Sequence, residues 1–169
     1  MANWRRRLYD WKIRNLAYSM GFGIFLLAIA VYLVIMHTGI NEQSLLRTKT
    51  IGSLDNISLP LSPKYIAENK ENIGSHVRSI ERILFAYTKG GQLGEEKTEV
   101  KINDKLKAET EELIVFWTPL KEELYNIQDG ETSISDAKES LQKKYSAFIK
   151  QHGKAKELVN EINKEEEAA

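Results

Sequence analysis

Residues 16–36 read LAYSMGFGIFLLAIAVYLVIM, a run without a charged side chain. At a rise of about 1.5 Å per residue, a helix of this length spans about 30 Å, the thickness of a bilayer's hydrocarbon core. The exit from the run, Met36-His37-Thr38-Gly39, lacks the small-x-small pattern of a signal-peptide cleavage site. We therefore predict a transmembrane helix over residues 16–36, with a cleaved signal peptide as the alternative interpretation.

The two flanks of this run differ in charge, and the difference predicts its orientation. After the run, only Arg47 and Lys49 are basic within fifteen residues. Positive charge favours the cytoplasmic side, so we expect residues 1–15 to be a cytoplasmic basic tail and the bulk of the chain to be periplasmic, on a single-pass inner-membrane anchor. The tail holds the basic residues Arg5, Arg6, Arg7, Lys12 and Arg14, the acidic Asp10, and the interfacial aromatic residues Trp4, Tyr9 and Trp11.

Composition excludes several classes of function. Residues 42–169 carry 19 basic and 23 acidic side chains, an acidic balance that argues against a nucleic-acid partner. The chain has no cysteine, so thiolate nucleophiles and cysteine metal sites are excluded. His37, His76 and His152 are not spaced as a helical pair of zinc ligands. We expect no metal and no cofactor.

Prolines and glycines divide residues 41–165 into four segments, and within the last three the apolar residues recur at steps of three and four. This spacing is typical of helices with one buried face. We therefore predict an all-α fold, with a single N-terminal transmembrane helix followed by an antiparallel four-helix bundle over residues 41–165. The apolar stripes comprise Ile66, Ile73, Val77, Ile80, Leu84 and Tyr87; Leu106, Leu113, Trp117, Leu120, Leu124 and Ile127; and Leu141, Tyr145, Phe148, His152, Ala155, Val159 and Ile162.

Local signals predict how the helices begin and where they are disturbed. The first segment, residues 41–58, most simply continues the membrane helix. Ser62-Pro63 is typical of a helix start, and Ser133 with Asp136 resembles a capping box. Pro119 is expected to kink the third helix, and Gly153 to loosen the fourth or end it early.

Several motifs have a functional and a simpler structural interpretation. The glycine-rich loop 89–94 lacks the Gly-Lys-Ser/Thr ending of a phosphate-binding loop, so we favour a flexible link between helices. The glutamates of residues 109–123 lack histidines at metal-ligand spacing, and most should face solvent. Trp117 and His152 fit core positions better than ligand positions. Because no nucleophile is paired with a base, we predict no enzymatic activity.

Arg47 is the exception, because it sits a few turns above the predicted membrane on the segment with the fewest apolar residues. We expect this face to meet a second copy of the chain, where paired arginines would offer forked donors to a small anion and couple its binding to dimerisation. The simpler alternative is an arginine that extends to lipid headgroups or to solvent.

Three stretches resemble the N-terminal sensory domain of type IV pili methyl-accepting chemotaxis transducers and the related periplasmic nitrate/nitrite sensor domain. They are Ile40-Asn41 with Leu46-Arg47, the segment 82–87 leading into Gly90-Gly91, and the segment 113–124 with Trp117, Pro119 and Leu120. The glycine and first arginine that the family has between Asn41 and Arg47 are missing, and Thr48-Lys49-Thr50 replace its Met-Leu-Ser-Gln continuation. The resemblance spans residues 40–128.

This resemblance implies a membrane-anchored four-helix sensory module, dimeric and non-enzymatic, with Asn41 and Arg47 as ligand-binding residues. Its partners would be membrane lipid, a second copy of the chain and a small anion. The alternative is an accessory or scaffold subunit of a larger membrane complex. These two readings differ in whether the domain binds a ligand or only other proteins.

Overall fold

A computed structural model describes the backbone of residues 2–94 and 97–168, and the side chains of Tyr18 and of residues 22–94 and 97–168. About 85% of the chain is helical and almost none is strand, which confirms the predicted all-α class. The chain divides into two compact units, Met1–Asn41 and Glu42–Ala169, which are described separately below.

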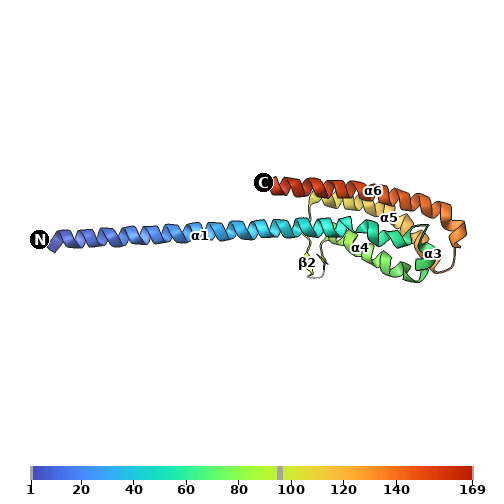
Figure 1. The fold of residues 1–169 in the computed structure, drawn as a ribbon, viewed down its shortest axis with the longest axis horizontal. Coiled ribbons are helices and arrows are strands. Elements are labelled where there is room, and N and C mark those ends of the chain that lie inside the picture. The colour runs from blue at the N-terminus through green and yellow to red at the C-terminus, as the bar shows by residue number, and fades with distance from the viewer. Residues whose placement is uncertain (1, 95–96, 169) are drawn as a thin grey trace. The chain divides into compact units, whose positions relative to one another are not determined.

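The first unit consists of most of helix α1 (Ala2–Gly52), shown in blue in Figure 1. Residues 22–38 of this helix are exposed throughout, although most of them are large and apolar. By length and composition, the described residues contain one helix suited to crossing a membrane, and it lies near the N-terminus. The side chains of the predicted basic tail, with those of Trp4, Tyr9 and Trp11, lie outside the described residues.

Helix α1 continues into the second unit without a break, as expected for the segment that follows the apolar run. Two short elements follow it, α2 (Leu54–Ser58) and the 3-10 turn η1 (Leu59–Leu61). Ile51, Leu54 and Leu61 are fully buried, so this part of the chain belongs to the core.

The predicted helix start at Ser62-Pro63 is too early, because α3 begins at Ile66 with Tyr65 at its N-cap. Ser62 is extended, and its hydroxyl has no hydrogen-bond partner within the described part of the chain. A single turn α3 (Ile66–Asn69) and the 3-10 turn η2 (Lys70–Asn72) come next, and the long helix α4 spans Ile73–Lys89. The backbone carbonyl of Ser62 accepts the first turn's N–H groups from Tyr65 and Ile66, so the main chain and not the hydroxyl closes this turn.

The glycine-rich loop forms a small antiparallel hairpin, with strands β1 (Gln92–Leu93) and β2 (Thr98–Glu99), in place of the expected flexible link. Gly90 and Gly94 have φ of 84° and 78°, values that favour glycine. Leu93 and Val100 are buried, so the hairpin is packed onto the helices.

Helices α5 (Asp104–Gln128) and α6 (Ile134–Ala168) complete the second unit. The Asn103 side chain caps α5 by accepting from the N–H groups of Lys105 and Leu106. The N-cap half of the predicted capping box is confirmed, because the Ser133 hydroxyl accepts from the Asp136 N–H at 3.2 Å; the Asp136 carboxylate accepts from this hydroxyl.

The two residues expected to disturb these helices do not end them. Helix α5 continues through Pro119 to Gln128. Helix α6 continues through Gly153 to Ala168, so the expected early end at this glycine is wrong.

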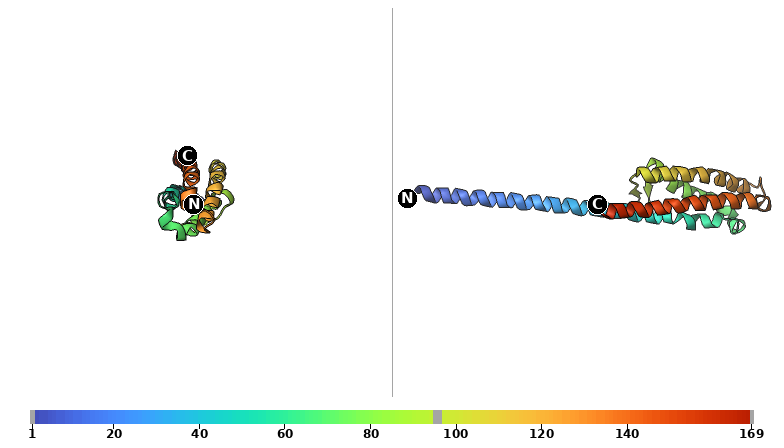
Figure 2. Two further views of the ribbon diagram at one scale, coloured as in Figure 1. Left: turned by 90° about the vertical axis from the view of Figure 1, so that its right-hand side faces the viewer. Right: turned by 90° about the horizontal axis from the view of Figure 1, so that it is seen from above.

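The long helices pack in antiparallel pairs around one core, with α5 lying between α4 and α6 (Figure 1). Figure 2 shows α5 and α6 running beside each other in the view from above. Two ion pairs show that α5 and α6 are antiparallel. Lys105 at the start of α5 pairs with Glu165 near the end of α6, and Glu123 near the end of α5 pairs with Lys144 in the first half of α6. In α4 and α5, Glu81 pairs with Lys121. The predicted stripe residues are buried except for Tyr145, which is partly buried against the core. Trp117 lies against Phe148 at a ring separation of 5.3 Å.

Candidate functional site

Polar side chains join the end of α1, and the short helix α2, to one face of α6. We call this group the α1–α6 junction. Its members all lie in the second unit, and they connect residues about a hundred positions apart in the chain. They are Arg47, Thr48, the carbonyl of Ile51, Asp55, His152, Lys156, Asn163 and Glu166.

Arg47 lies at the end of the junction nearest the C-terminal end of α6. Its Nε and one terminal nitrogen donate to the Asn163 side-chain oxygen at 3.1 and 2.9 Å, and the same terminal nitrogen forms an ion pair with Glu166. The Asn163 amide nitrogen donates to the Thr48 hydroxyl at 3.0 Å. Arg47 is only 2% exposed, so its charge is neutralised within the chain.

This arrangement corrects the expectation that the Arg47 face of the first helix meets a partner and not a closed core. Leu46, Arg47 and Ile51 are all buried by the chain itself. An anion at Arg47 would have to compete with the Glu166 carboxylate. Its binding remains a prediction, but the site is not pre-formed.

The two predicted ligand-binding residues are not brought together. Asn41 is exposed and belongs to the first unit, whereas Arg47 is buried in the second. They are six residues apart on α1, which places their side chains about 120° apart around the helix axis. A ligand held by both residues would have to span two faces of this helix.

His152 lies deeper in the junction and is fully buried. Its Nδ1 is 2.7 Å from a carboxylate oxygen of Asp55, and its Nε2 is 2.6 Å from the carbonyl oxygen of Ile51. The other Asp55 oxygen accepts from Lys156 Nζ at 2.7 Å. The core position predicted for His152 is therefore occupied by a histidine with polar partners on both sides.

The cations around Asp55 decide its charge. Partial burial acts to raise the pKa of this carboxyl, but the hydrogen bonds and positive charges of Lys156 and His152 outweigh burial and hold the pKa below its ordinary value. Asp55 is therefore a carboxylate at neutral pH.

Tyr87 of α4 connects the junction to the core through its hydroxyl, which lies 2.7 Å from the Thr50 hydroxyl. Thr50 gives its own proton to the Leu46 carbonyl, so the Tyr87 hydroxyl must be the donor. Burial raises the pKa of Tyr87, while the nearby charge of Arg47 acts in the opposite direction.

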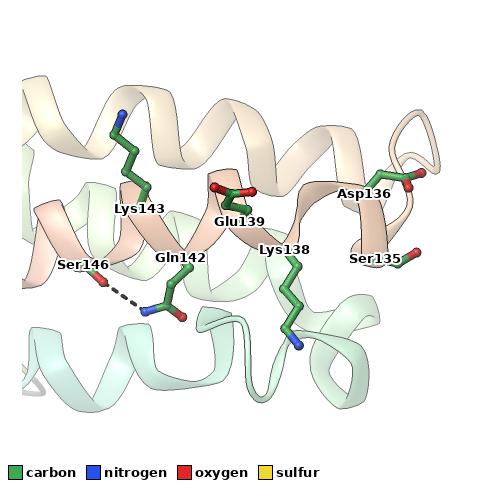
Figure 3. Close-up of a pocket in the computed structure, with 7 residues that line it drawn as sticks. All are labelled: Ser135, Asp136, Lys138, Glu139, Gln142, Lys143 and Ser146. Atoms are coloured by element: carbon green, nitrogen blue, oxygen red, sulfur yellow. Dashed lines mark hydrogen bonds between the residues drawn. The ribbon is translucent and has the colours of Figure 1, made fainter.

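Two hollows that lie outside the α1–α6 junction are weaker candidates for a binding site. Figure 3 shows one on the outer side of α6, where all the residues that line it come from this single helix and are exposed. The lining residues are Ser135, Asp136, Lys138, Glu139, Gln142, Lys143 and Ser146. A surface made by exposed residues of one helix is a solvated helix face.

A smaller cavity of about 70 Å³ lies between α4 and α5, against Trp117 and beneath the Glu81–Lys121 ion pair. The Trp117 indole nitrogen is buried and finds no acceptor in the described part of the chain. The ring packs on Phe148, which agrees with its predicted place in the core.

Among the side chains that the structure describes, those of Tyr18 and of residues 22–94 and 97–168, no three histidines or carboxylates gather closely enough to hold a metal ion. Two glutamates of α5 contact side chains of α6, and Glu123 also accepts from the Ser140 hydroxyl at 3.1 Å. Glu109 accepts from Gln151 at 2.7 Å, Glu123 pairs with Lys144, and the pKa of Glu109 is raised by burial and by the charge of Glu112.

Sequence reasoning found Arg47 and His152 but missed their partners. Asp55, Lys156, Asn163 and Glu166 look like ordinary exposed polar residues in the sequence. One signal was available, because residues 152, 156, 159, 163 and 166 follow each other at steps of three and four and so share one face of α6.

Comparison of the chain with protein-family models, with curated proteins and with solved structures finds no match. The class of protein is therefore defined by its own features. It is an all-α protein with one N-terminal helix long and apolar enough to span a membrane and a buried polar junction between α1 and α6.

Proposed function

We propose that this protein is a membrane-anchored, periplasmic sensory or binding module, built as an antiparallel four-helix bundle and without enzymatic activity. In this proposal the exposed apolar part of α1 is the inner-membrane anchor, the basic tail is cytoplasmic, and the domain from residue 42 onward binds a small anion or a partner protein and forms a homodimer.

The observation that carries the proposal is the continuity of α1. One helix contributes both the exposed apolar segment and the buried residues Leu46, Arg47 and Ile51. A helix without a break is suited to passing a displacement along its axis. Shifts of about 1–2 Å between neighbouring helices are typical of such signalling.

The α1–α6 junction is the element that ligand binding would bias. It consists of hydrogen bonds and ion pairs, in contrast to the apolar packing of α5 against its neighbours. An anion that replaced Glu166 at Arg47 would release the C-terminal end of α6 from α1. Such an exchange of partners gives the ligand the differential affinity that a conformational change requires.

A second candidate function is a scaffold subunit of a larger membrane assembly. One observation favours it. Arg47, the residue expected to bind the ligand, already has its charge neutralised by Glu166 and its donors occupied by Asn163. A domain whose one buried arginine is satisfied internally needs no ligand to be stable.

Reporter fusions test the membrane topology. A periplasm-specific reporter fused after Ala169 should be active, and the same reporter fused after Arg14 should be inactive. An N-terminal tag retained on the full-length product separates an anchor from a cleaved signal peptide. An inactive fusion at Ala169, with an active cytoplasmic reporter at the same position, would contradict the proposed orientation.

Calorimetry on the full chain in detergent separates the sensory module from the scaffold. Nitrate, nitrite and small carboxylates should release or absorb heat with the native chain and not with Arg47→Ala, and binding should change the oligomeric state. If none of them binds, and the oligomeric state is the same in both variants, the scaffold function replaces the sensory one.

A further inference from the structure

The His152 ring has an unusual set of partners, because both of its nitrogens face oxygen atoms that only accept hydrogen bonds. One is the Asp55 carboxylate, at 2.7 Å from Nδ1, and the other is the Ile51 carbonyl, at 2.6 Å from Nε2. A neutral imidazole carries one N–H and one lone pair, so it can satisfy only one of the two. The charged imidazolium carries two N–H groups and satisfies both.

We propose that His152 is an imidazolium in the folded protein and acts as a proton-operated latch that holds α6 to the end of α1 and to α2. With the proton in place, the ring bridges a carbonyl of α1 and a carboxylate of α2. When the proton leaves to solvent, a lone pair faces one of these oxygens at hydrogen-bond distance, and that contact becomes repulsive.

The groups around the ring favour the charged form on balance. Asp55 on α2 contributes a negative charge directly at Nδ1. The Ile51 carbonyl lies in the last turn of α1, at the negative end of the helix dipole, where a cation is stabilised. Lys156, one turn along α6, opposes the imidazolium, but its ammonium is bound to the far oxygen of Asp55.

Aromatic side chains of α5 and α6 lie on the other sides of the ring and of Asp55. Phe148 stacks on the His152 ring at a centroid distance of 6.5 Å and an interplanar angle of 13°, with Trp117 of α5 behind Phe148. Tyr145 of α6 lies near Asp55, and burial keeps its phenol neutral by raising its pKa. The ring itself is fully buried, whereas the Asp55 side chain is 40% exposed.

The stabilising effect of the latch changes with pH in one direction only. The folded state holds the ring proton through two contacts that the unfolded chain lacks, so their contribution to stability is present at low pH. It is lost as the pH rises through the range in which the ring releases its proton. The consequence is local, because it loosens α6 from the Ile51–Asp55 segment while the apolar contacts of α6 with α5 remain.

Nitrogen NMR of the full chain in detergent micelles, labelled at histidine, reads the charge of the ring directly. The exposed His37 and the half-buried His76 serve as internal references in the same spectra. From about pH 5 to about pH 8, His152 should keep the signals of two N–H groups to a higher pH than either reference. A neutral tautomer of His152 at the pH where His76 is still charged would overturn the proposal.

Two neighbouring substitutions sharpen the test because they should act in opposite directions. Asp55→Asn removes the negative partner, so His152 should lose its second proton at a lower pH than in the native chain. Lys156→Gln removes the competing cation and leaves Asp55 to His152 alone, so the proton should be kept to a higher pH. Equal or reversed shifts would contradict the arrangement.

Hydrogen exchange tests whether the proton operates a latch or is only a buried charge. After correction for the intrinsic pH dependence of exchange, protection of amides in residues 51–58 and 148–156 should fall as His152 becomes neutral. Amides of α4 should not follow. Protection that stays constant while the NMR signals change would limit His152 to a static ion pair and overturn the latch.

Discussion

Arg47 illustrates how a single buried charge is accommodated in this domain. Its guanidinium is 2% exposed and is held by Asn163 and Glu166, which lie more than one hundred residues further along the chain. Removing one partner of such a group leaves the other partner without its counter-charge. The arginine therefore contributes to the attachment of α6 to α1 as well as being the predicted ligand-binding residue.

We expect Arg47→Ala to lower the free energy of unfolding by about 1–3 kcal/mol, since Glu166 is partly exposed and can recover some hydration. Lys105→Ala is the matched control. Lys105 of α5 pairs with Glu165, which lies on α6 beside Glu166, but both side chains of this pair are largely exposed. It should change stability by less than about 1 kcal/mol. Urea unfolding of both variants measures the difference, and equal values would show that the Arg47 contacts do not stabilise the domain.

Tyr87 makes a prediction at high pH. Because its pKa is raised in the folded state, its contribution is complete below the unfolded value of about 10 and is lost as the pH rises through the folded pKa. Stability should therefore fall above about pH 10 in the native chain and less steeply in Tyr87→Phe. Tyr65→Phe, at a less buried tyrosine, is the control. Melting temperatures across this range report the effect, and parallel curves for all three proteins would contradict it.

At the scale of elements, neither Gly153 nor Pro119 ends its helix, and the kink predicted at Pro119 stays a prediction. Helix α6 passes through Gly153, and α5 passes through Pro119, because the packing of each helix along a partner outweighs the local cost at one residue. Ser62-Pro63 fails as a helix start although its local pattern fits. The Ser62 hydroxyl is buried without a hydrogen-bond partner in the described part of the chain, and short turns intervene before α4 begins.

Gly153 is therefore a site where stability can be gained. A Cβ atom built there meets nothing within 4 Å, so Gly153→Ala should stabilise the protein by about 0.5–1 kcal/mol through higher helix propensity. Gly130→Ala is the contrasting variant. Its surroundings are equally open, but its φ of 79° is unfavourable for alanine, and we expect a loss of about 1 kcal/mol. Thermal unfolding distinguishes a gain from a loss, and a gain in both variants would show that backbone conformation is irrelevant at Gly130.

Hairpin β1–β2 shows how an element with little intrinsic stability is held. The Gln43 amide donates to the Glu99 carbonyl at 2.8 Å and accepts from the Lys101 N–H at 3.0 Å, so one side chain of α1 pairs with the hairpin backbone as a strand would. The neighbouring Glu42 accepts from the Thr98 hydroxyl. Two-residue strands have few hydrogen bonds of their own, and these contacts from α1 supply the rest.

At the scale of the whole molecule, the second unit has its own core and should fold without the apolar part of α1. Residues 42–169 are expected to be helical and to unfold cooperatively. Leu120→Ala, at a fully buried position of α5, should cost about 2–5 kcal/mol. Val115→Ala on the same helix, where the side chain is 67% exposed, should change stability by less than about 0.5 kcal/mol.

Circular dichroism of residues 42–169 during thermal unfolding measures both the helicity and the cooperativity. A melting temperature that is unchanged by Leu120→Ala would show that the stripe of α5 does not face the core. A segment that is helical only in detergent would show that the second unit depends on the first for its fold.

The sequence by itself determined the all-α class, the apolar N-terminal helix, the stripes of α4, α5 and α6, and the N-cap at Ser133. These features depend on residues within a few turns of each other, and helical periodicity makes such local patterns visible. The resemblance to chemotaxis and nitrate sensor domains stays a prediction, as do the dimer and the anion.

Only the tertiary structure decided what Arg47, Gln43 and His152 contact. Their partners lie 56 to 119 residues away, and each is one of many polar residues with no local mark of its role. Which of them meet depends on the axial register of α1 against α6 and against the hairpin. That register is set by the packing of the whole core, which no short pattern in the sequence encodes.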